Sequence, residues 1–403
     1  MKIKFPAEPW MRAAVILWSL LAVAYIVKMF TDGDQKSVYP IFHTASHHWW
    51  QQENLYARYE GIDLFRYSPT FAILLTPFAL LPMLVGSVVW TFFGIALLLW
   101  ALHTLVRELL PGTWDTRREG MFLVLAVAGS VRGIWSGQSN SHLLALAIFA
   151  AVAVYRRQWW PAAAMLAAAF FIKLWPIALL MLLASFWPKP LIPRFMAVSA
   201  GLALIPFLTA SRDWVLAMYR EYYASLIYTS KLRWPGNRDA WTIWEEIQPV
   251  DPSAYQILQL ATAGVVFLWC QWQRRRDPSI RRLLTLTLAA WVAWQLLFGP
   301  GTERLTYGLI APFASWAILV SPRGSWERRI AWLAWWLTAL LGTGAAERAL
   351  LPVFEHAKAI QPSGVVVFIL WLAIFGRRID LDPASADPAA SVEPTGSPAH
   401  AFA

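Results

Sequence analysis

Two aspartates just after the first apolar segment are the first residues whose type and spacing could do chemistry. Asp32 and Asp34 flank Gly33, which permits a sharp turn. A carboxylate at a membrane-surface active site can take a proton from an attacking hydroxyl group. The alternative is a solvated turn after a helix end, and the spacing alone favours it. His47 and His48 follow in the same loop, but adjacent residues point to different faces of a helix, so we expect ordinary hydrated side chains there.

Lys173 is the most informative polar residue inside an apolar segment, because an ionisable side chain at membrane depth is costly. Pro176 cannot donate a hydrogen bond to the carbonyl of Ile172, so the helix is weakened where the lysine lies. Broken backbone at this depth is tolerated where it lines a polar cavity. A lysine there is a suitable point-charge partner for a phosphate. An equal alternative is a lysine that extends from a half-helix end to the lipid headgroups.

Three other polar clusters separate apolar runs. Residues 137–140 read Gly-Gln-Ser-Asn and follow Arg132; they could hydrogen-bond a sugar or a phosphate, or cap the next helix, with capping slightly favoured. Glu303 and Arg304 are adjacent in a turn and form either a loop salt bridge or a second anion contact. The basic, aromatic turn at 231–239 suits a lipid-headgroup anchor and an acceptor contact about equally.

The elements that must position these residues are membrane helices. Of the 403 residues, 58% are hydrophobic and 14% are charged, against about 45–50% and about 25% in soluble proteins. This composition excludes a water-soluble enzyme, a fibrous repeat and a disordered scaffold. The single cysteine excludes an internal disulfide, and no Cys/His pair has zinc spacing. With 26 Trp and long apolar runs, the net charge of +10 indicates a bilayer surface rather than nucleic acid.

The first crossing is predicted at Trp10–Phe30, because about 20 apolar residues span about 30 Å of hydrocarbon. No small-residue cleavage site follows, so we expect a retained signal anchor. The segment 159–187 is too long for one crossing and is expected to form two half-helices around Lys173. The total is about 12 or 13 crossings. The remaining segments are expected at 68–81, 83–105, 120–136, 139–155, 191–210, 254–272, 283–299, 305–321, 329–346 and 363–376.

The charge of each loop predicts the side of the membrane on which it lies. Cytoplasmic loops carry an excess of Lys and Arg, and such clusters occur at 274–282, 323–329 and 377–378. The long loops 31–66 and 211–253 carry slightly more acidic than basic side chains and are expected outside, together with the turn at 299–304. The topology between 68 and 158 stays open, because the loop 106–119 is nearly balanced in charge; one short segment there is a candidate re-entrant element.

A short helix over 41–54 is predicted in the first outer loop, because Phe42, Ala45 and Trp49 recur at helical spacing. We expect it to lie flat on the membrane surface. The chain divides into a membrane domain, residues 1–378, and a tail, residues 379–403. The tail carries acidic but no basic residues and too few apolar ones to fold, so we expect a disordered cytoplasmic end.

Three motifs, in this order, resemble glycosyltransferase family 87. They are RYSPTF from Arg66 followed by AILLTPFALLP, then GQSNSHLLALAIFAAVAVYRRQWW, then AAAMLAAAFFIKLWPIALL. The family pattern is a tyrosine–proline entry into a helix, a Gly-Gln-x-Asn element, a basic turn and a helix with Lys then Pro. The resemblance covers residues 30–190, and the GPGTER turn is similar only loosely to a later outer turn.

The resemblance implies an all-α integral membrane bundle of the GT-C type that transfers a sugar, usually mannose, from a polyprenyl-phosphate carrier. It implies inversion at the anomeric carbon, with a first-outer-loop carboxylate as base. That base maps to Asp34, but the distance to Tyr39 is one residue longer than the family pattern, so Asp32 stays open. The implied donor-phosphate contacts are Lys173, Arg304 and Arg66, and the implied substrate contacts are Tyr67, Gln138, Asn140, Glu303 and Arg132.

We therefore predict a multi-pass cell-membrane glycosyltransferase whose active site faces the extracytoplasmic side. Its expected partners are a polyprenyl-phosphate sugar, a lipid or glycan acceptor and membrane lipids, with no nucleic acid and no cofactor beyond the lipid-linked donor. The alternative is a transporter or flippase of lipid-linked sugars, which would also use a broken helix and a buried lysine. The two sizeable outer loops favour the transferase, because a lipid-fed transferase needs a platform for its acceptor.

Overall fold

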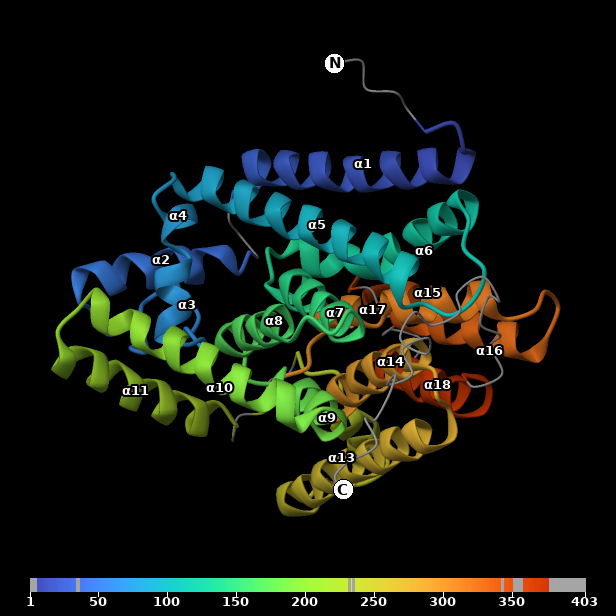
Figure 1. Ribbon diagram of the computed structural model, residues 1–403. Helices are drawn as coiled ribbons and strands as arrows, with labels where there is room; N and C mark the ends of the chain where they lie inside the picture. Colours follow the sequence, from blue (N-terminus) through green and yellow to red (C-terminus); the bar gives the residue numbers. More distant parts are fainter. Residues whose placement is uncertain are drawn as a thin grey trace, which may run out of the picture.

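The described residues fold into helices, most of them joined by short turns, with a longer connection at 52–68 (Figure 1). The computed structural model describes residues 6–33, 37–230, 233, 236–341, 344–350 and 358–376. The tail 379–403 and Asp34 lie outside these described residues.

Four helices within the described ranges are long and apolar enough to cross a membrane. They are α1 (Pro9–Thr31), α5 (Met83–Glu108), the continuous pair α10 (Pro188–Leu204) and η1 (Ile205–Leu208), and α13 (Pro252–Arg276). In α1, Trp18 and Tyr25 are buried in the protein, whereas Leu20 and Val23 leave more than half of their surface exposed. Apolar side chains exposed along one face of a long helix suit contact with lipid, and the predicted first crossing is confirmed as a helix.

Shorter helices fill the interior. They are α6 (Thr116–Trp135), α7 (Asn140–Tyr155), α8 (Trp159–Ile172), α9 (Ile177–Phe186), α14 (Ile280–Phe298), α15 (Ala311–Val320), α16 (Trp326–Trp335) with its π-helical continuation η3 (Trp336–Leu341), α17 (Gly344–Leu350) and α18 (Ile360–Phe375). Most residues of α7 and α14 are buried, and both lie at the centre of Figure 1. The prediction of an all-α integral membrane protein is confirmed, while the full number of crossings stays a prediction.

The predicted break in the segment 159–187 is confirmed. α8 ends at Ile172, Lys173 adopts an extended backbone (φ −141°, ψ 146°), and α9 begins at Ile177 after Pro176. The proline removes the N–H that would have continued the helix. Lys173 therefore projects from a helix end rather than from the side of a continuous helix.

The segment 68–81 does not form the crossing helix expected from its composition. It forms α3 (Pro69–Leu74) and α4 (Thr76–Ala79), six and four residues long. Helices of this length rise about 1.5 Å per residue and cannot cross about 30 Å of hydrocarbon. Prolines stand in the first turn of both helices and again at position 82, and they divide the apolar run into short pieces.

The helix predicted in the first outer loop is α2 (Tyr39–Gln51). Phe42, Ala45 and Trp49 lie on its buried face as their spacing predicted. However, this face packs on protein rather than on lipid: the Phe42 ring meets those of Tyr67 and Trp90, with centroids 5.0 and 5.6 Å away. The expectation that the helix lies flat on a membrane surface is therefore wrong for its apolar face.

The described helices leave turns at two opposite ends of the bundle. At one end, which we call the basic end, Arg281 donates to the carbonyl of Leu110 at 2.9 Å and Trp316 donates to the carbonyl of Pro111 at 3.1 Å. The loop 106–119, whose side the sequence left open, therefore lies beside the basic loops at 274–282 and 321–325.

At the other end, which we call the site end, α2, α3, α4 and α11 (Arg212–Ser230) gather at the left of Figure 1. The Trp49 indole donates to Thr209 at 3.1 Å and packs on Trp214. The two remaining short helices, α12 (Ala240–Glu245) and η2 (Arg304–Leu309), connect the later crossings. The polar motifs singled out in the sequence meet at this end.

Candidate functional site

Lys173 is fixed inside the protein by an amide. Its ammonium donates to Oδ1 of Asn140 at 3.0 Å and lies 5.8 Å from the centroid of the Tyr67 ring. Glu303 and Arg66 are the charged groups that act on it electrostatically. This geometry disfavours a lysine that extends to the headgroups and favours a charge held at a defined position beside the Tyr67 ring.

The turn between α6 and α7 positions Asn140. Gly137 has φ +62°, its N–H donates to the carbonyl of Ile134, and the next N–H donates to that of Gly133, which is the pattern of a Schellman helix end. The N-cap of α7 is Ser139, which makes no side-chain capping bond. Asn140 instead spans two elements: its Oδ1 accepts from Lys173 and its Nδ2 donates to the carbonyl of Leu305 at 3.3 Å.

Tyr67 forms the aromatic wall of the site. Its carbonyl accepts from the Tyr56 hydroxyl at 2.9 Å, and its side chain is buried next to Ser139. Burial raises the pKa of the Tyr67 hydroxyl well above its usual value, so it stays a hydrogen-bond donor at neutral pH. The following residue, Ser68, caps α3 and donates to the carbonyl of Phe171 at 2.5 Å. This contact ties the start of α3 to the end of α8 and brings Tyr67 to Lys173.

Arg66 and the Glu303–Arg304 turn bring further charges to the site. One Nη of Arg66 donates to the Asp63 carboxylate at 2.9 Å, and the side chain keeps 28% of its surface exposed. Glu303 acts electrostatically on both Lys173 and Tyr67. Arg304 is half-buried and begins η2. The structure therefore brings Arg66, Tyr67, Asn140, Lys173 and Glu303 together.

The second long loop holds this turn in place. Asn237 and Glu303 form an isolated antiparallel bridge, and the N–H of Arg238 donates to the carbonyl of Thr302 at 2.8 Å. Arg233 forms a two-pronged ion pair with Asp239 at 2.7 and 2.9 Å. Both described arginines of the basic turn thus make contacts within the protein. Residues 231, 232, 234 and 235 of that turn lie outside the described residues.

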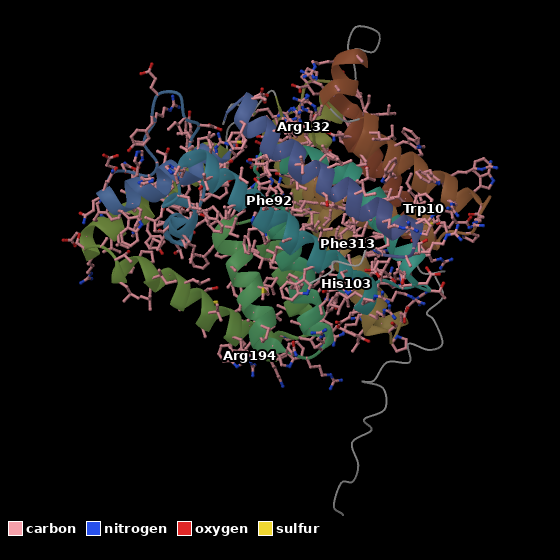
Figure 2. All side chains as sticks on the ribbon, turned by 90° about the horizontal axis from the view of Figure 1, so that it is seen from above. Trp10, Phe92, His103, Arg132, Arg194 and Phe313 are labelled. Atoms are coloured by element: carbon pink, nitrogen blue, oxygen red, sulfur yellow. The ribbon has the colours of Figure 1, made fainter. Side chains whose placement is uncertain are left out.

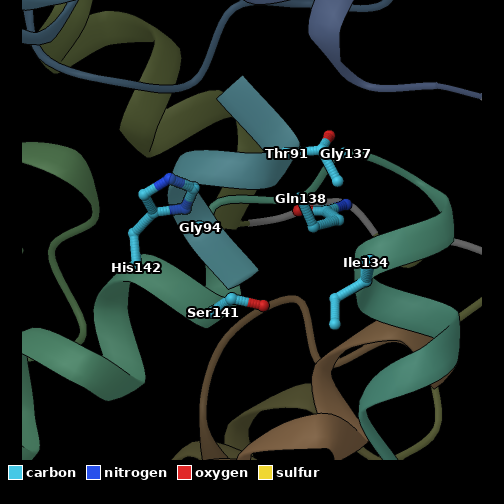
Figure 3. Close-up of a pocket in the computed structure, with 7 residues that line it drawn as sticks. All are labelled: Thr91, Gly94, Ile134, Gly137, Gln138, Ser141 and His142. Atoms are coloured by element: carbon cyan, nitrogen blue, oxygen red, sulfur yellow. The ribbon is translucent and has the colours of Figure 1, made fainter. Parts of the chain in front are cut away.

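Arg132 and Gln138 lie on either side of the turn. Arg132 is half-buried in the last turn of α6, near the C-terminal end of α1 and far from Trp10 (Figure 2). Gln138 lines a small pocket together with His142 (Figure 3). These two residues border the turn that carries Asn140.

Of the two candidate bases, the structure describes Asp32 only. Asp32 is exposed and forms the C-cap of α1, where its backbone N–H donates to the carbonyl of Lys28 at 2.8 Å. Asp34 lies outside the described residues. Beyond it, the N–H of Val38 donates to the carbonyl of Ser136 at 2.8 Å. The first outer loop therefore returns to the turn that carries Asn140.

The sequence interpretation gave no role to Lys28, which the structure places against the same turn. Only 3% of it is exposed; its ammonium donates to the carbonyl of Trp135 at 2.8 Å and lies near the rings of Tyr25 and Trp135. A lysine within an otherwise uncharged run was the available signal.

The histidines of α2 make structural contacts. His47 hydrogen-bonds the carbonyl of Ala79 at 3.0 Å, and His48 lies 3.2 Å from the Glu53 carboxylate. Burial lowers the pKa of His43 and His48, which keeps both rings neutral at physiological pH. Among the described residues, no group of three or more His, Cys, Asp or Glu side chains could hold a metal ion.

The fold is that of an all-α integral-membrane protein, and a fixed lysine lies at the end of a broken helix beside amide and aromatic side chains. The model of glycosyltransferase family 87 matches residues 65–300, which is more than half of the chain. The chain therefore belongs to glycosyltransferase family 87 and is a glycosyltransferase. A search of curated proteins gave no match. The matched range contains Arg66, Tyr67, Asn140 and Lys173, and it begins after both candidate bases.

Proposed function

We propose that the enzyme transfers mannose from a polyprenyl-phosphate donor to a lipid or glycan acceptor, with inversion at the anomeric carbon. The observation that carries the proposal is the Lys173 ammonium, held by Asn140 beside the Tyr67 ring. A fixed positive charge next to an aromatic wall suits a sugar phosphate, because the charge meets the phosphate and the ring meets the sugar.

The proposed reaction is a single displacement. The acceptor hydroxyl attacks the anomeric carbon from the side opposite the phosphate, and its proton passes to a carboxylate of the first outer loop. The bond between the anomeric carbon and the phosphate oxygen breaks, and its electron pair leaves with the polyprenyl phosphate. The acceptor gains the sugar with inverted configuration. Asp34 is the proposed base and Asp32 the alternative.

Negative charge grows on the phosphate as it leaves, so basic groups near it lower the barrier. Lys173 is the first of these groups, and Arg66 and Arg304 are proposed to assist it. The fork of donors on a guanidinium suits a phosphate, and Arg66 keeps 28% of its side-chain surface exposed. Losing one such contact typically costs about 2.7–4 kcal/mol of transition-state stabilisation.

The proposed substrate contacts surround this charge. Asn140 orients Lys173, and the Tyr67 hydroxyl serves as a donor. Glu303 offers a carboxylate to sugar or acceptor hydroxyl groups, and its charge offsets part of the positive charge when no donor is bound. Gln138 and Arg132, at the border of the cluster, are proposed to meet the sugar and the acceptor respectively.

We propose that the site end faces the extracytoplasmic side of the cell membrane. Arginine-rich loops remain in the cytoplasm, and the basic end carries the described arginines of the 274–282 and 323–329 loops together with the loop 106–119. A donor that reaches the site from the bilayer would place its isoprenoid chain against the exposed apolar faces of the helices.

The test is a transfer assay with purified protein in liposomes, supplied with radiolabelled polyprenyl-phosphate mannose and extracted membrane lipids. We expect labelled mannose on an acceptor with inverted anomeric configuration. Movement of intact labelled donor across the bilayer, without transfer, would instead establish a flippase. A parallel series with polyprenyl-phosphate glucose distinguishes mannose from another hexose.

A further inference from the structure

A small polar pocket lies next to the charged cluster, between α5, the end of α6 and the start of α7. Figure 3 shows side chains from all three helices and from the intervening turn arranged around one space. The lining residues are Thr91, Gly94, Ile134, Gly137, Gln138, Ser141 and His142. The space is of the size that holds a single water molecule or one hydroxyl group.

Two buried polar atoms around this pocket have no hydrogen-bond partner in the protein. They are Oγ1 of Thr91 and Oε1 of Gln138. Beside them, neither ring nitrogen of His142 makes a well-aligned hydrogen bond, and the polar neighbour of the ring is the backbone of Trp90. Thr91 and His142 are only 4% and 3% exposed. Buried polar groups in native proteins nearly always find a partner, and an unsatisfied one costs about 1–3 kcal/mol. Two such side chains around one space, with the imidazole beside them, indicate an occupant that bonds to them.

The walls of the pocket are fixed. The His142 ring stacks on Trp90 with centroids 3.9 Å apart and planes 14° apart, and the Trp90 indole donates to the carbonyl of Gly137 at 3.0 Å. A Cβ at Gly94 would lie 2.5 Å from Cε1 of His142, so only glycine allows this close approach. Stacking on Trp90 and the close approach to Gly94 therefore hold the imidazole at the edge of the pocket.

The chemistry of the lining selects the type of occupant. A threonine hydroxyl both donates and accepts, an amide oxygen accepts, and a neutral imidazole offers one donor and one acceptor. This mixture suits a hydroxyl group, which also donates and accepts. It does not suit a phosphate, which only accepts, because the Gln138 oxygen would face it.

The pocket adjoins the candidate site through one turn. Gln138 is two residues from Asn140, the residue that holds Lys173. The carbonyl of Leu305, which accepts from Asn140, lies 3.1 Å from where a Cβ would stand on Gly133, the residue before Ile134 of the lining. The turn that leads to Asn140 therefore also lines the pocket.

We propose that this pocket binds one hydroxyl group of the transferred sugar, and that Thr91, Gln138 and His142 determine which sugar the enzyme accepts. The inference rests on the proposed function and adds the residues that select the sugar. A sugar lacking that hydroxyl, or carrying it in the other orientation, leaves these buried groups unpaired and is rejected.

The experiment is a matrix of variants and donors, using the full-length protein in liposomes. The donors are polyprenyl-phosphate mannose and four analogues, each lacking one hydroxyl group at C2, C3, C4 or C6. The variants are Thr91→Val, Gln138→Met and His142→Phe, which keep side-chain size and remove the polar atoms. Thr338→Val is the matched control, because Thr338 is equally buried and its hydroxyl bonds only within its own helix, to Ala334 and Trp335.

We expect the wild-type enzyme to discriminate against one deoxy donor by about 10- to 100-fold in kcat/KM. Thr91→Val or Gln138→Met should lower kcat/KM for the parent donor by a similar factor and leave it unchanged for that deoxy donor. Thr338→Val should keep the wild-type pattern. If the pocket variants slow all donors equally, or if no deoxy donor is disfavoured, the pocket holds a structural water and the inference is wrong. Absence of transfer from every donor by the wild type would overturn the proposed function itself.

Discussion

At the scale of single residues, the central pair is Lys173 and Asn140. From the sequence alone, Lys173 could lie either at the lipid headgroups or at a phosphate. Asn140 could either cap a helix or contact a ligand. The bond of 3.0 Å between them holds the lysine inside the protein and disfavours a lysine that extends to the headgroups. A lysine that is held by a buried amide and is not paired directly with a carboxylate keeps its charge available to an anion.

The first prediction concerns this charge. Lys173→Met keeps most of the stem but removes the ammonium, and we expect kcat/KM for the lipid-linked donor to fall on the order of 10²–10³-fold. Lys189→Met, an exposed lysine at the start of α10, is the control and should have no effect. Steady-state assays with varied donor provide the measurement, and an unchanged donor dependence in Lys173→Met would remove its phosphate role.

The second prediction separates the two candidate bases. Asp34→Asn should lower kcat by about 10²–10⁴-fold, because the variant cannot accept the acceptor's proton. Asp32→Asn should keep activity, since the described contact of Asp32 is made by its backbone, and His47→Ala should keep it as well. Loss of activity in Asp32→Asn alone would transfer the role of base to Asp32, and full activity in both would exclude the pair.

At the scale of elements, the broken helix matters most. A continuous helix would carry residue 173 on its side, whereas the break leaves it at the end of α8 in extended conformation. The cause is local: Pro176 interrupts the hydrogen-bond ladder, and α9 starts only at Ile177. The position of the charge therefore depends on a residue three places further along the chain.

The third prediction tests that dependence. Pro176→Ala restores an N–H that can bond to the carbonyl of Ile172, which favours helix through Lys173 and moves the ammonium away from Asn140. We expect kcat/KM for the donor to fall on the order of 10²-fold, because a displacement of about 1 Å can have that effect. Pro193→Ala, at an exposed proline inside α10, should leave donor use intact. Equal donor use in both variants would show that the break does not position the lysine.

At the scale of the whole molecule, the two ends have different chemistry. Loops at the basic end bond to one another across the bundle, as in the contact between Arg281 and Leu110. Loops at the site end converge on Lys173. The basic end thus carries the clustered arginines of the 274–282 and 323–329 loops, and the other end carries the candidate chemistry.

The fourth prediction is the sidedness of these ends. In closed cells, a membrane-impermeant thiol reagent should label Ser253→Cys, at the exposed start of α13, but not Gln158→Cys, in the exposed turn between α7 and α8. Cys270 is 1% exposed, so the wild-type background should stay low. Labelling of Gln158→Cys alone would reverse the proposed orientation.

Sequence alone determined the class of the protein and its local breaks. The excess of apolar over charged residues required a membrane, Pro176 required an interrupted helix, and the spacing of Phe42, Ala45 and Trp49 required the short helix α2. Each of these features depends on composition or on residues within a few positions of one another. Local backbone geometry and the cost of burying charge in a membrane are therefore enough to predict it.

Only the tertiary structure decided which of the scarce polar groups meet. Asn140 and Lys173 are 33 positions apart, and Lys28 meets Trp135 across 107 positions. The sequence pattern also could not predict which surface α2 covers. Nor could it predict the end of the bundle at which the loop 106–119 lies. The physical reason is that a buried polar group accepts whichever partner the packing of distant helices brings to it, and no residue near it in the chain specifies that partner.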